Sequence, residues 1–247
     1  NSSSEYFGHT QRNIFGKPIP ICGVAGDQQS ALFGQTCFEP GIIKNTYGTG
    51  CFMLTHLADK LKYSKNGLIT TRAAQTSHNP CYALEGSVFI GGAVVQWIKD
   101  GLKAISKSEE IEKLALNVPD SGGVIFAPAF SGLGAPYWRP DLRGSISGIT
   151  RGTTIDNIAY AALESIAFQS CDLIKSMNID LESNGMDRIR ELRVDGGACA
   201  NDLLLQIQSD LSGIPVVRPN IIETTALGVA YLAGLKTGVF KDENFLK

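Results

Sequence analysis

Apolar and polar residues alternate over several short stretches of the chain, a spacing that predicts β-strands. Residues 42–47 and 51–55 show this spacing most clearly, and the Gly48-Thr49-Gly50 between them predicts a tight hairpin turn. The strand at 81–84 is expected to end at Glu85-Gly86. Further strands are expected at residues 19–24, 67–71, 123–127, 144–150, 192–195 and 215–218.

Helical spacing of apolar residues alternates with these strands. It is clearest over residues 153–177, where Ile155, Ile158 and Ile166 share one face and Thr153 with Asp156 resembles a capping box. Other helices are expected at residues 28–35, from 88 to about 102, and at 108–116, 202–211 and 224–236. Alternating strands and helices predict an α/β fold in which helices pack on a mixed sheet.

Length, charge and hydropathy narrow the class of protein. The 247 residues are enough for one large domain or two modest ones. A net charge of -2 predicts no surface for nucleic acid or an anionic membrane. No apolar run approaches the roughly 20 residues of a membrane span. The polar start resembles neither a signal peptide nor a transit peptide. Because it is Asn1 and not Met, we expect a piece of a longer polypeptide.

The distribution of the cysteines indicates the cellular compartment. None of them forms a CxxC pair, and most lie among apolar or small residues. Such a distribution favours buried, reduced thiols over a disulfide framework or a zinc site, and therefore predicts a cytoplasmic protein. The six residues are Cys22, Cys37, Cys51, Cys81, Cys171 and Cys199.

One glycine-flanked turn presents a carboxylate and two amides. The stretch from Gly23 to Gly34 contains Asp27, Gln28 and Gln29 directly after the expected strand at 19–24. The small residues on both sides let the backbone approach a bound molecule. Asp27 is suited to accept a proton from a substrate hydroxyl, and Gln28 to hold a second hydroxyl. The alternative is an ordinary turn in which Asp27 caps the following helix.

Three further glycine turns are candidates for binding an anion. Gly48-Thr49-Gly50 offers backbone N–H groups and a hydroxyl, although such a turn is usually only a hairpin. Gly91-Gly92 has no side chains, so either a ligand or a neighbouring strand can approach the backbone closely. Asp195-Gly196-Gly197 joins a strand to a helix N-terminus, where a ligand is favoured. Because neither GxGxxG nor GxxxxGK[ST] occurs, a nucleotide would be held by these turns.

Taken together, these stretches resemble the FGGY family of carbohydrate kinases, from about residue 19 to residue 239. The family's second signature matches Gly144-Ser145-Ile146-Ser147-Gly148-Ile149, then Asn157-Ile158, then Ala161-Ala162-Leu163-Glu164. The resemblance is closest to the members that act on glycerol. It rests there on Gly26-Asp27-Gln28-Gln29, Asn45-Thr-Tyr-Gly-Thr-Gly-Cys-Phe52, Gly132-Leu-Gly-Ala-Pro-Tyr-Trp138 and Val194-Asp-Gly-Gly-Ala-Cys-Ala-Asn201.

The resemblance implies a fold and a division of the chain. The expected fold is an actin-like, ribonuclease-H-like ATPase in which two lobes close on a cleft, and this chain is mainly the second lobe. Residues 1–36 are expected to be the end of the N-terminal lobe and the hinge edge. Residues 37–247 are expected to form the C-terminal, nucleotide-binding lobe.

The resemblance also implies an activity, which is ATP-dependent phosphorylation of glycerol to sn-glycerol 3-phosphate with Mg²⁺. Asp27 is expected to be the general base, Gln28 a hydrogen-bonding partner of glycerol, and Phe52 an apolar wall. No residue of this chain is expected to be a metal ligand, and a homo-oligomer, dimer or tetramer, is implied. The nucleotide contacts are expected to be Thr49 at the transferring phosphate, Gly92 and Gln96 on the phosphate side, and Gly197 and Asn201 on the adenosine side.

Two alternatives stay open beside this activity. One is a kinase of the same family acting on another polyol or a pentose. The other is a non-catalytic, actin-like nucleotide-binding module. Because the family's first lobe supplies further substrate contacts, the isolated chain is expected to be a poor catalyst.

Overall fold

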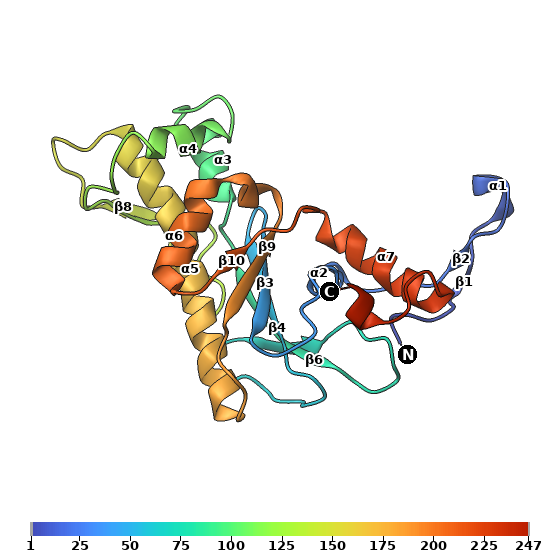
Figure 1. Ribbon diagram of the computed structural model, residues 1–247. Helices are drawn as coiled ribbons and strands as arrows, with labels where there is room; N and C mark the ends of the chain where they lie inside the picture. Colours follow the sequence, from blue (N-terminus) through green and yellow to red (C-terminus); the bar gives the residue numbers. More distant parts are fainter. Residues whose placement is uncertain (1, 247) are drawn as a thin grey trace.

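A six-stranded mixed sheet lies at the centre of the computed structural model, which describes residues 2–246 (Figure 1). The strand order is β10-β9-β3-β4-β6-β5. Strands β10, β9 and β3 run parallel, whereas β4, β6 and β5 are added as antiparallel neighbours. This confirms the expected mixed sheet. The strands are β3 (Ile42–Tyr47), β4 (Cys51–His56), β5 (Ile69–Arg72), β6 (Tyr82–Val88), β9 (Glu191–Asp195) and β10 (Val216–Val217).

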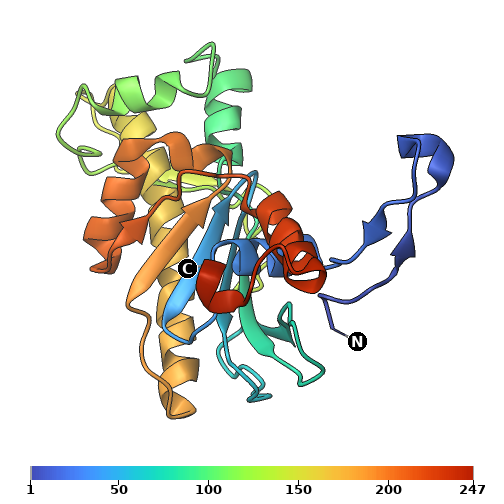
Figure 2. The same ribbon diagram turned by 45° about the vertical axis from the view of Figure 1, so that its right-hand side comes forward.

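Four helices lie on one side of the sheet, where the main core is buried. The long helix α5 (Ile155–Ser183) contacts β4 and β6, and α6 (Asp202–Ser212) packs beside it. The helices α3 (Ala93–Asp100) and α4 (Glu110–Ala115) lie toward one end of α5 (Figure 2). Alternating strand residues such as Ile43 and Met53 meet α5 residues such as Leu173 in one apolar cluster.

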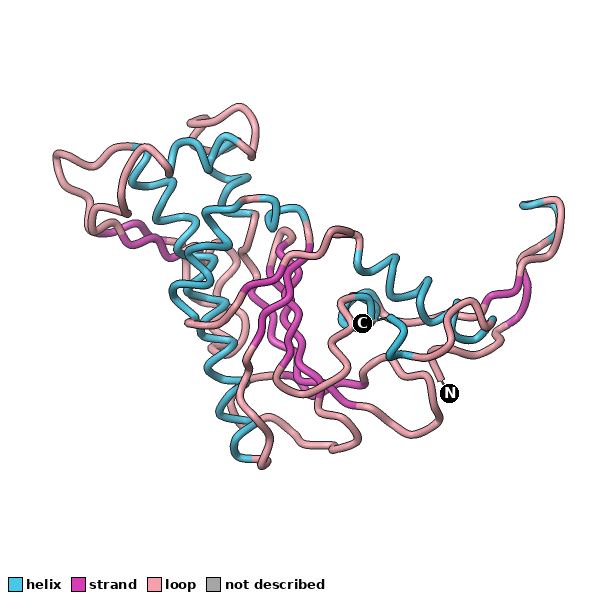
Figure 3. The backbone as a smooth tube through the Cα atoms, viewed as in Figure 1, coloured by secondary structure: helices cyan, strands magenta, loops and turns pink. Residues whose placement is uncertain are grey.

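Two helices lie on the opposite side of the sheet (Figure 3). Helix α2 (Asp27–Gly34) contacts β3, β4 and α7 (Thr224–Thr237). The predicted inward residues Ala31, Leu32 and Phe33 are all buried, as expected. The two helix backbones touch closely, since a Cβ built on Gly228 would lie 1.9 Å from the Ser30 carbonyl oxygen.

The N-terminal residues extend from this body as a narrow arm (Figure 1). In the arm, β1 (Gly8–His9) pairs only with β2 (Pro20–Ile21), and α1 (Arg12–Phe15) lies between them. The prediction of a strand at 19–24 is therefore wrong in two respects. The strand covers only Pro20–Ile21, and it lies outside the main sheet. Ile21 and Val24 are 40% and 50% exposed because this segment pairs outside the main sheet, although Cys22 is buried and Gly23 lies against α7.

Several other boundaries differ from the sequence prediction. Strand β6 continues through Glu85-Gly86 to Val88, so the helix predicted from 88 begins five positions later, at Ala93. Helix α5 extends past 177 to Ser183. Its capping box joins Thr154 and Asn157, not Thr153 and Asp156, and the Thr154 N–H donates to Asn157 Oδ1 at 3.0 Å.

The remaining elements are short. Strands β7 (Ile125–Ala127) and β8 (Ser145–Ser147) form a separate antiparallel ribbon. The 3₁₀ helices η1 (Gly197–Ala200) and η2 (Glu243–Leu246) follow β9 and α7. None of the helices between residues 2 and 246 is both long and apolar enough to cross a membrane.

Candidate functional site

A cavity of about 570 Å³ opens between the β3–β4 turn, α3, α4 and the start of α6. Its lining includes all five residues for which the sequence predicts nucleotide contacts, although they are spread over more than half of the chain. Their roles stay predictions, but they are neighbours in space. The five are Thr49, Gly92, Gln96, Gly197 and Asn201.

The β3–β4 turn and the start of α3 form one wall of this cavity. The N–H groups of Gly91 and Ala93 donate to the Thr49 carbonyl oxygen at 2.8 and 3.1 Å, and the Gly92 N–H donates to Gly48 at 2.9 Å. These bonds satisfy amides that a helix N-terminus leaves without intrahelical partners. A Cβ on Gly92 would lie 2.8 Å from the Gly48 carbonyl oxygen, so glycine is needed for the close approach.

The turn after β9 forms the opposite wall. Gly196 has φ +86°, and a Cβ there would lie 2.6 Å from the Tyr47 carbonyl oxygen. Gly197 differs, because a Cβ on it would meet nothing within 4 Å and would point into open space. Asn201 caps α6, since its Oδ1 accepts from the Leu204 N–H at 2.7 Å. Asn201 therefore has a structural role in addition to its predicted one.

Gln96 and its neighbours define the outer side of the cavity. The side chain is exposed on the first turns of α3, and its Nε2 donates to Asp100 one turn later. Glu109 and Glu112 approach from α4, and Glu112 accepts from the Leu203 N–H at 2.9 Å. This side is therefore polar, whereas Ile166 and Leu204 supply an apolar base.

The predicted substrate residues lie on the other side of the sheet. Asp27 is the first residue of α2 and is exposed, and its Oδ1 accepts from the Gln28 N–H at 2.8 Å. The N-cap position belongs to Gly26, so Asp27 is not the capping residue of this helix. Phe52 is partly buried on β4, where it pairs with Thr46 across the hairpin.

The hairpin connects this group to the cavity. Tyr47, Gly48 and Thr49 line the cavity at the hairpin tip. The next cross-strand pair is Thr46 with Phe52, and successive strand residues point to opposite faces of the sheet. The same hairpin therefore carries the predicted phosphate contact at its tip and the predicted apolar wall beside the start of α2.

Lys44 is a polar residue of this region that reasoning from the sequence missed. Its side chain is fully buried, and Nζ donates to Gln28 Oε1 and, at 2.9 Å, to Thr46 Oγ1. Burial lowers its pKa to about 8, while the carboxylates of Asp195 and Glu85 act in the opposite direction. A lysine that directly follows Ile42 and Ile43 inside the predicted strand at 42–47 is the signal that could have found it.

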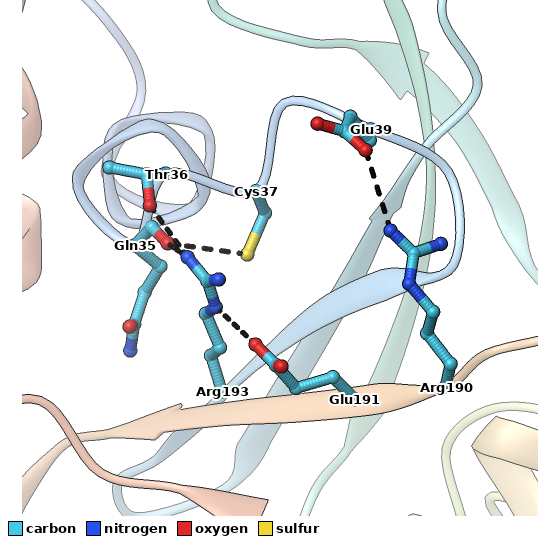
Figure 4. Close-up of polar contacts among 7 residues, drawn as sticks. All are labelled: Gln35, Thr36, Cys37, Glu39, Arg190, Glu191 and Arg193. Atoms are coloured by element: carbon cyan, nitrogen blue, oxygen red, sulfur yellow. Dashed lines mark hydrogen bonds and ion pairs between the residues drawn. The ribbon is translucent and has the colours of Figure 1, made fainter. Parts of the chain in front are cut away.

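The end of α2 is tied to β9 through Arg193 (Figure 4). The Arg193 guanidinium donates to the Gln35 carbonyl oxygen at 2.5 Å and to Thr36 Oγ1 at 2.6 Å, and it pairs with Glu191 at 2.7 Å. The carbonyl end of a helix is its negative end, so a cation is favoured there.

Asp195 adds a second tie between β9 and α2. It is 2% exposed, and its Oδ2 accepts from Gln35 Nε2 at 3.0 Å and from the Thr224 hydroxyl of α7. Lys44 and Gln28 hold the start of the same helix. Helix α2, which carries Asp27, is therefore held at both ends by polar side chains of the sheet.

Comparison with known proteins assigns the chain to a family. Residues 43–237 match the family model described as the FGGY family of carbohydrate kinases, C-terminal domain. A glycerol kinase of Leptothrix cholodnii is 61% identical over 239 residues, which is 97% of this chain and 48% of the relative. A glycerol kinase of Acidovorax ebreus is 64% identical over 96% of this chain. The chain spans about half the length of the curated relatives that it matches.

Solved structures are similar over nearly the whole chain. The crystal structure of Plasmodium falciparum glycerol kinase with ADP superposes with a TM-score of 0.90 and 39% identity, covering 98% of this chain and 48% of that one. A xylulose kinase of Lactobacillus acidophilus, with a TM-score of 0.79 and 23% identity over 93% of this chain and 45% of that one, shares the fold. The expected actin-like ATPase fold is thereby confirmed. From the family match and these structures it follows that the chain belongs to the FGGY family of carbohydrate kinases.

Proposed function

We propose that the protein containing this chain transfers the γ-phosphate of ATP to glycerol, giving sn-glycerol 3-phosphate. The observation that carries the proposal is the meeting of Thr49, Gly92, Gln96, Gly197 and Asn201 at one cavity. Its volume of about 570 Å³ is within the range of small-molecule sites. The names of the similar proteins, glycerol kinases, support glycerol as the acceptor.

The cavity is the proposed nucleotide site. The open space beside Gly197 supports this assignment, because the backbone there leaves room that a side chain would fill. The similar Plasmodium falciparum glycerol kinase was crystallised with ADP, which supports a nucleotide as the ligand. In this proposal Gly197 and Asn201 contact the adenosine, and Thr49, Gly92 and Gln96 contact the phosphates.

Asp27, Gln28 and Phe52 form the proposed acceptor site. Asp27 would take the proton from the glycerol hydroxyl as its oxygen attacks the γ-phosphorus and the bond to the ADP oxygen breaks. Its exposure at the start of α2 supports the role, since the carboxylate is accessible to a substrate. Gln28 would hydrogen-bond a second hydroxyl, and Phe52 would cover the carbon chain.

Mg²⁺ is proposed to bind together with ATP. Between residues 2 and 246, no three His, Cys, Asp or Glu side chains are grouped so that they could hold a metal ion. In this proposal the ion is held mainly by phosphate oxygens and water, as Mg²⁺ usually is beside a nucleotide. When bound, the ion supplies positive charge against the phosphates.

The assay should use the complete gene product that contains residues 1–247. Glycerol-dependent ADP release is measured beside ATP binding, with pentoses and other polyols as competing acceptors. We expect glycerol to give the highest kcat/KM. A pentose as the preferred acceptor would reassign the substrate, and nucleotide binding without transfer to any acceptor would favour the non-catalytic alternative.

One substitution separates transfer from binding. Asp27→Asn keeps the size of the side chain and removes the base, so we expect ADP release to fall at least a hundred-fold while ATP binding is retained. Asp187→Asn changes another exposed aspartate and should leave both measurements unchanged. Full activity of Asp27→Asn would contradict its role as the base.

Three further expectations belong to this proposal. A cytoplasmic location is supported by the six cysteines, which are all free thiols. A homo-oligomer is the second, and the mass of the purified protein in solution tests it. The third is the division of the chain into the end of the N-terminal lobe, residues 1–36, and the C-terminal lobe, residues 37–247.

A further inference from the structure

A buried ammonium group occupies an unusual position in the sheet. Lys44 is 0% exposed on β3, with Leu54 and Arg193 opposite it on the neighbouring strands. A lysine loses its hydration at such a position, so lysines are almost never fully buried without partners. The ion pairs of the described residues nevertheless do not include Lys44. The direct hydrogen-bond partners of the ammonium group are therefore neutral groups.

Those neutral groups are two side chains at the acceptor site. Lys44 Nζ donates to Gln28 Oε1 and to Thr46 Oγ1. An ammonium group is only a donor, so the amide that faces it must present its oxygen. The NH₂ group of Gln28 consequently points the other way, where Nε2 lies 3.4 Å from Asp27 Oδ2. The carboxamide is thus oriented from both sides.

The nearby carboxylates favour the protonated form of Lys44, so its ammonium group stays a hydrogen-bond donor. Burial lowers the pKa of Lys44 to about 8, and the carboxylates of Asp195, Glu85 and Asp27 act against this shift. The group is therefore mainly protonated at neutral pH. A protonated Lys44 excludes the flipped amide, whose NH₂ group would face the ammonium and whose oxygen would face the Asp27 carboxylate.

We propose that Lys44 is a positioning residue for phosphoryl transfer: its buried ammonium holds Gln28 with the NH₂ group toward Asp27 and the acceptor hydroxyls. This inference rests on the proposed function, in which Asp27 and Gln28 receive the acceptor. Lys44 itself touches neither the acceptor nor the reacting phosphate, and acts only through Gln28.

The first test is Lys44→Met in the complete gene product. Methionine keeps the length of the chain and removes both the charge and the donor. We expect kcat/KM for glycerol to fall at least ten-fold, with the Kd for ATP within two-fold. The unfolding midpoint should change little, because Gln28 and Thr46 are only partly buried and their oxygens can accept from water in the variant. Lys175→Met, at an exposed lysine of α5, is the control and should change neither.

A second variant tests the same contact without altering the core. Gln28→Glu retains an acceptor for Lys44 but has no NH₂ group to offer Asp27 or a hydroxyl. We expect a loss in kcat/KM similar to that of Lys44→Met, again with ATP binding retained. Wild-type kcat/KM in either variant would overturn the proposal.

A double-mutant cycle separates action through Gln28 from independent action. In a Gln28→Ala background the amide is absent, so adding Lys44→Met should lower kcat/KM by less than two-fold. If the two losses multiply instead, Lys44 acts by another route and the positioning role is wrong.

The orientation of the amide can be measured without turnover. The Gln28 side-chain NH₂ resonances should be distinct in the wild type, and in Lys44→Met they should shift and exchange faster with solvent. Identical resonances would overturn the positioning role, whatever the activity. If the wild type phosphorylates no polyol but the resonances change as expected, the proposed function fails and the contact between Lys44 and Gln28 stands.

Discussion

The Tyr47 hydroxyl of β3 donates to Gln208 Oε1 of α6 at 2.8 Å, with both side chains 0% exposed. The bond joins the strand that leads into the β3–β4 turn to the helix that follows Asn201. These two elements carry facing walls of the candidate nucleotide cavity. The spacing of the walls is therefore set partly by one buried polar contact.

The first prediction concerns that contact. Tyr47→Phe removes the hydroxyl donor, and the buried Gln208 oxygen then has lost this hydrogen bond. We therefore expect a loss of about 1–3 kcal/mol in the free energy of unfolding. Urea unfolding measures it. Tyr137→Phe is the matched control, because the Tyr137 hydroxyl donates to Asp172 at the same 2.8 Å on an exposed surface. Its loss should be below about 0.5 kcal/mol, and equal losses would contradict the importance of burial.

The second prediction tests the cavity as a ligand site. A Cβ on Gly197 meets no protein atom within 4 Å, so Gly197→Ala should leave the free energy of unfolding within about 0.5 kcal/mol of the wild type. If a nucleotide lies against this backbone, the same methyl group should weaken ATP binding at least ten-fold. Calorimetric titration with ATP measures the affinity. Unchanged affinity together with unchanged stability would argue against a nucleotide at this wall.

The third prediction concerns the contact between α2 and α7. A Cβ on Gly228 would lie 1.9 Å from the Ser30 carbonyl oxygen, so Gly228→Ala must push the helices apart. We expect a loss of about 1–3 kcal/mol or more, despite the better helix propensity of alanine. Gly152→Ala is the control, since its nearest atom would be 3.9 Å away. Chemical unfolding of both variants decides, and a stabilised Gly228→Ala protein would rule out the close packing.

The fourth prediction follows from His56 on β4. Its Nδ1 accepts from the Ala58 N–H at 2.9 Å, and burial lowers its pKa below the ordinary value. The folded protein therefore binds fewer protons here than the unfolded chain. The stabilisation is fully present above the unfolded pKa near 6.5 and is lost as the pH falls toward the folded pKa.

The measurement is the free energy of unfolding between pH 7.5 and 5. His56→Asn keeps an acceptor near the Ala58 N–H but does not titrate, so its stability should fall less steeply with acid than that of the wild type. Parallel curves for the two proteins would show that His56 is not responsible for the acid sensitivity.

Local patterns predicted much of the fold. The hairpin at 42–55 follows from alternation and a Gly-Thr-Gly turn, and the buried face of α2 follows from helical spacing. These features depend on residues that are close in the sequence. The glycine turns likewise identified residues that the structure gathers at the cavity, because a turn needs glycine wherever a backbone must approach closely.

The choice between competing partners could not be predicted in this way. The segment at 19–24 has the composition of a buried strand, yet β2 pairs only with β1 outside the main sheet. Likewise, the capping box uses Thr154, because Thr153 Oγ1 accepts from the Thr150 N–H at 2.9 Å instead. In both cases competing partners decided the outcome, and composition alone does not rank them.

The sequence by itself determined the α/β class, most of the elements, and the residues that resemble a kinase family. Only the tertiary structure decided that Lys44 meets Gln28 and that Asp195 meets Gln35 and Thr224. The physical reason is that strand and helix periodicity arise from neighbours within a few residues. The burial of a charge and the partner of a carboxylate depend instead on how separate elements pack against each other.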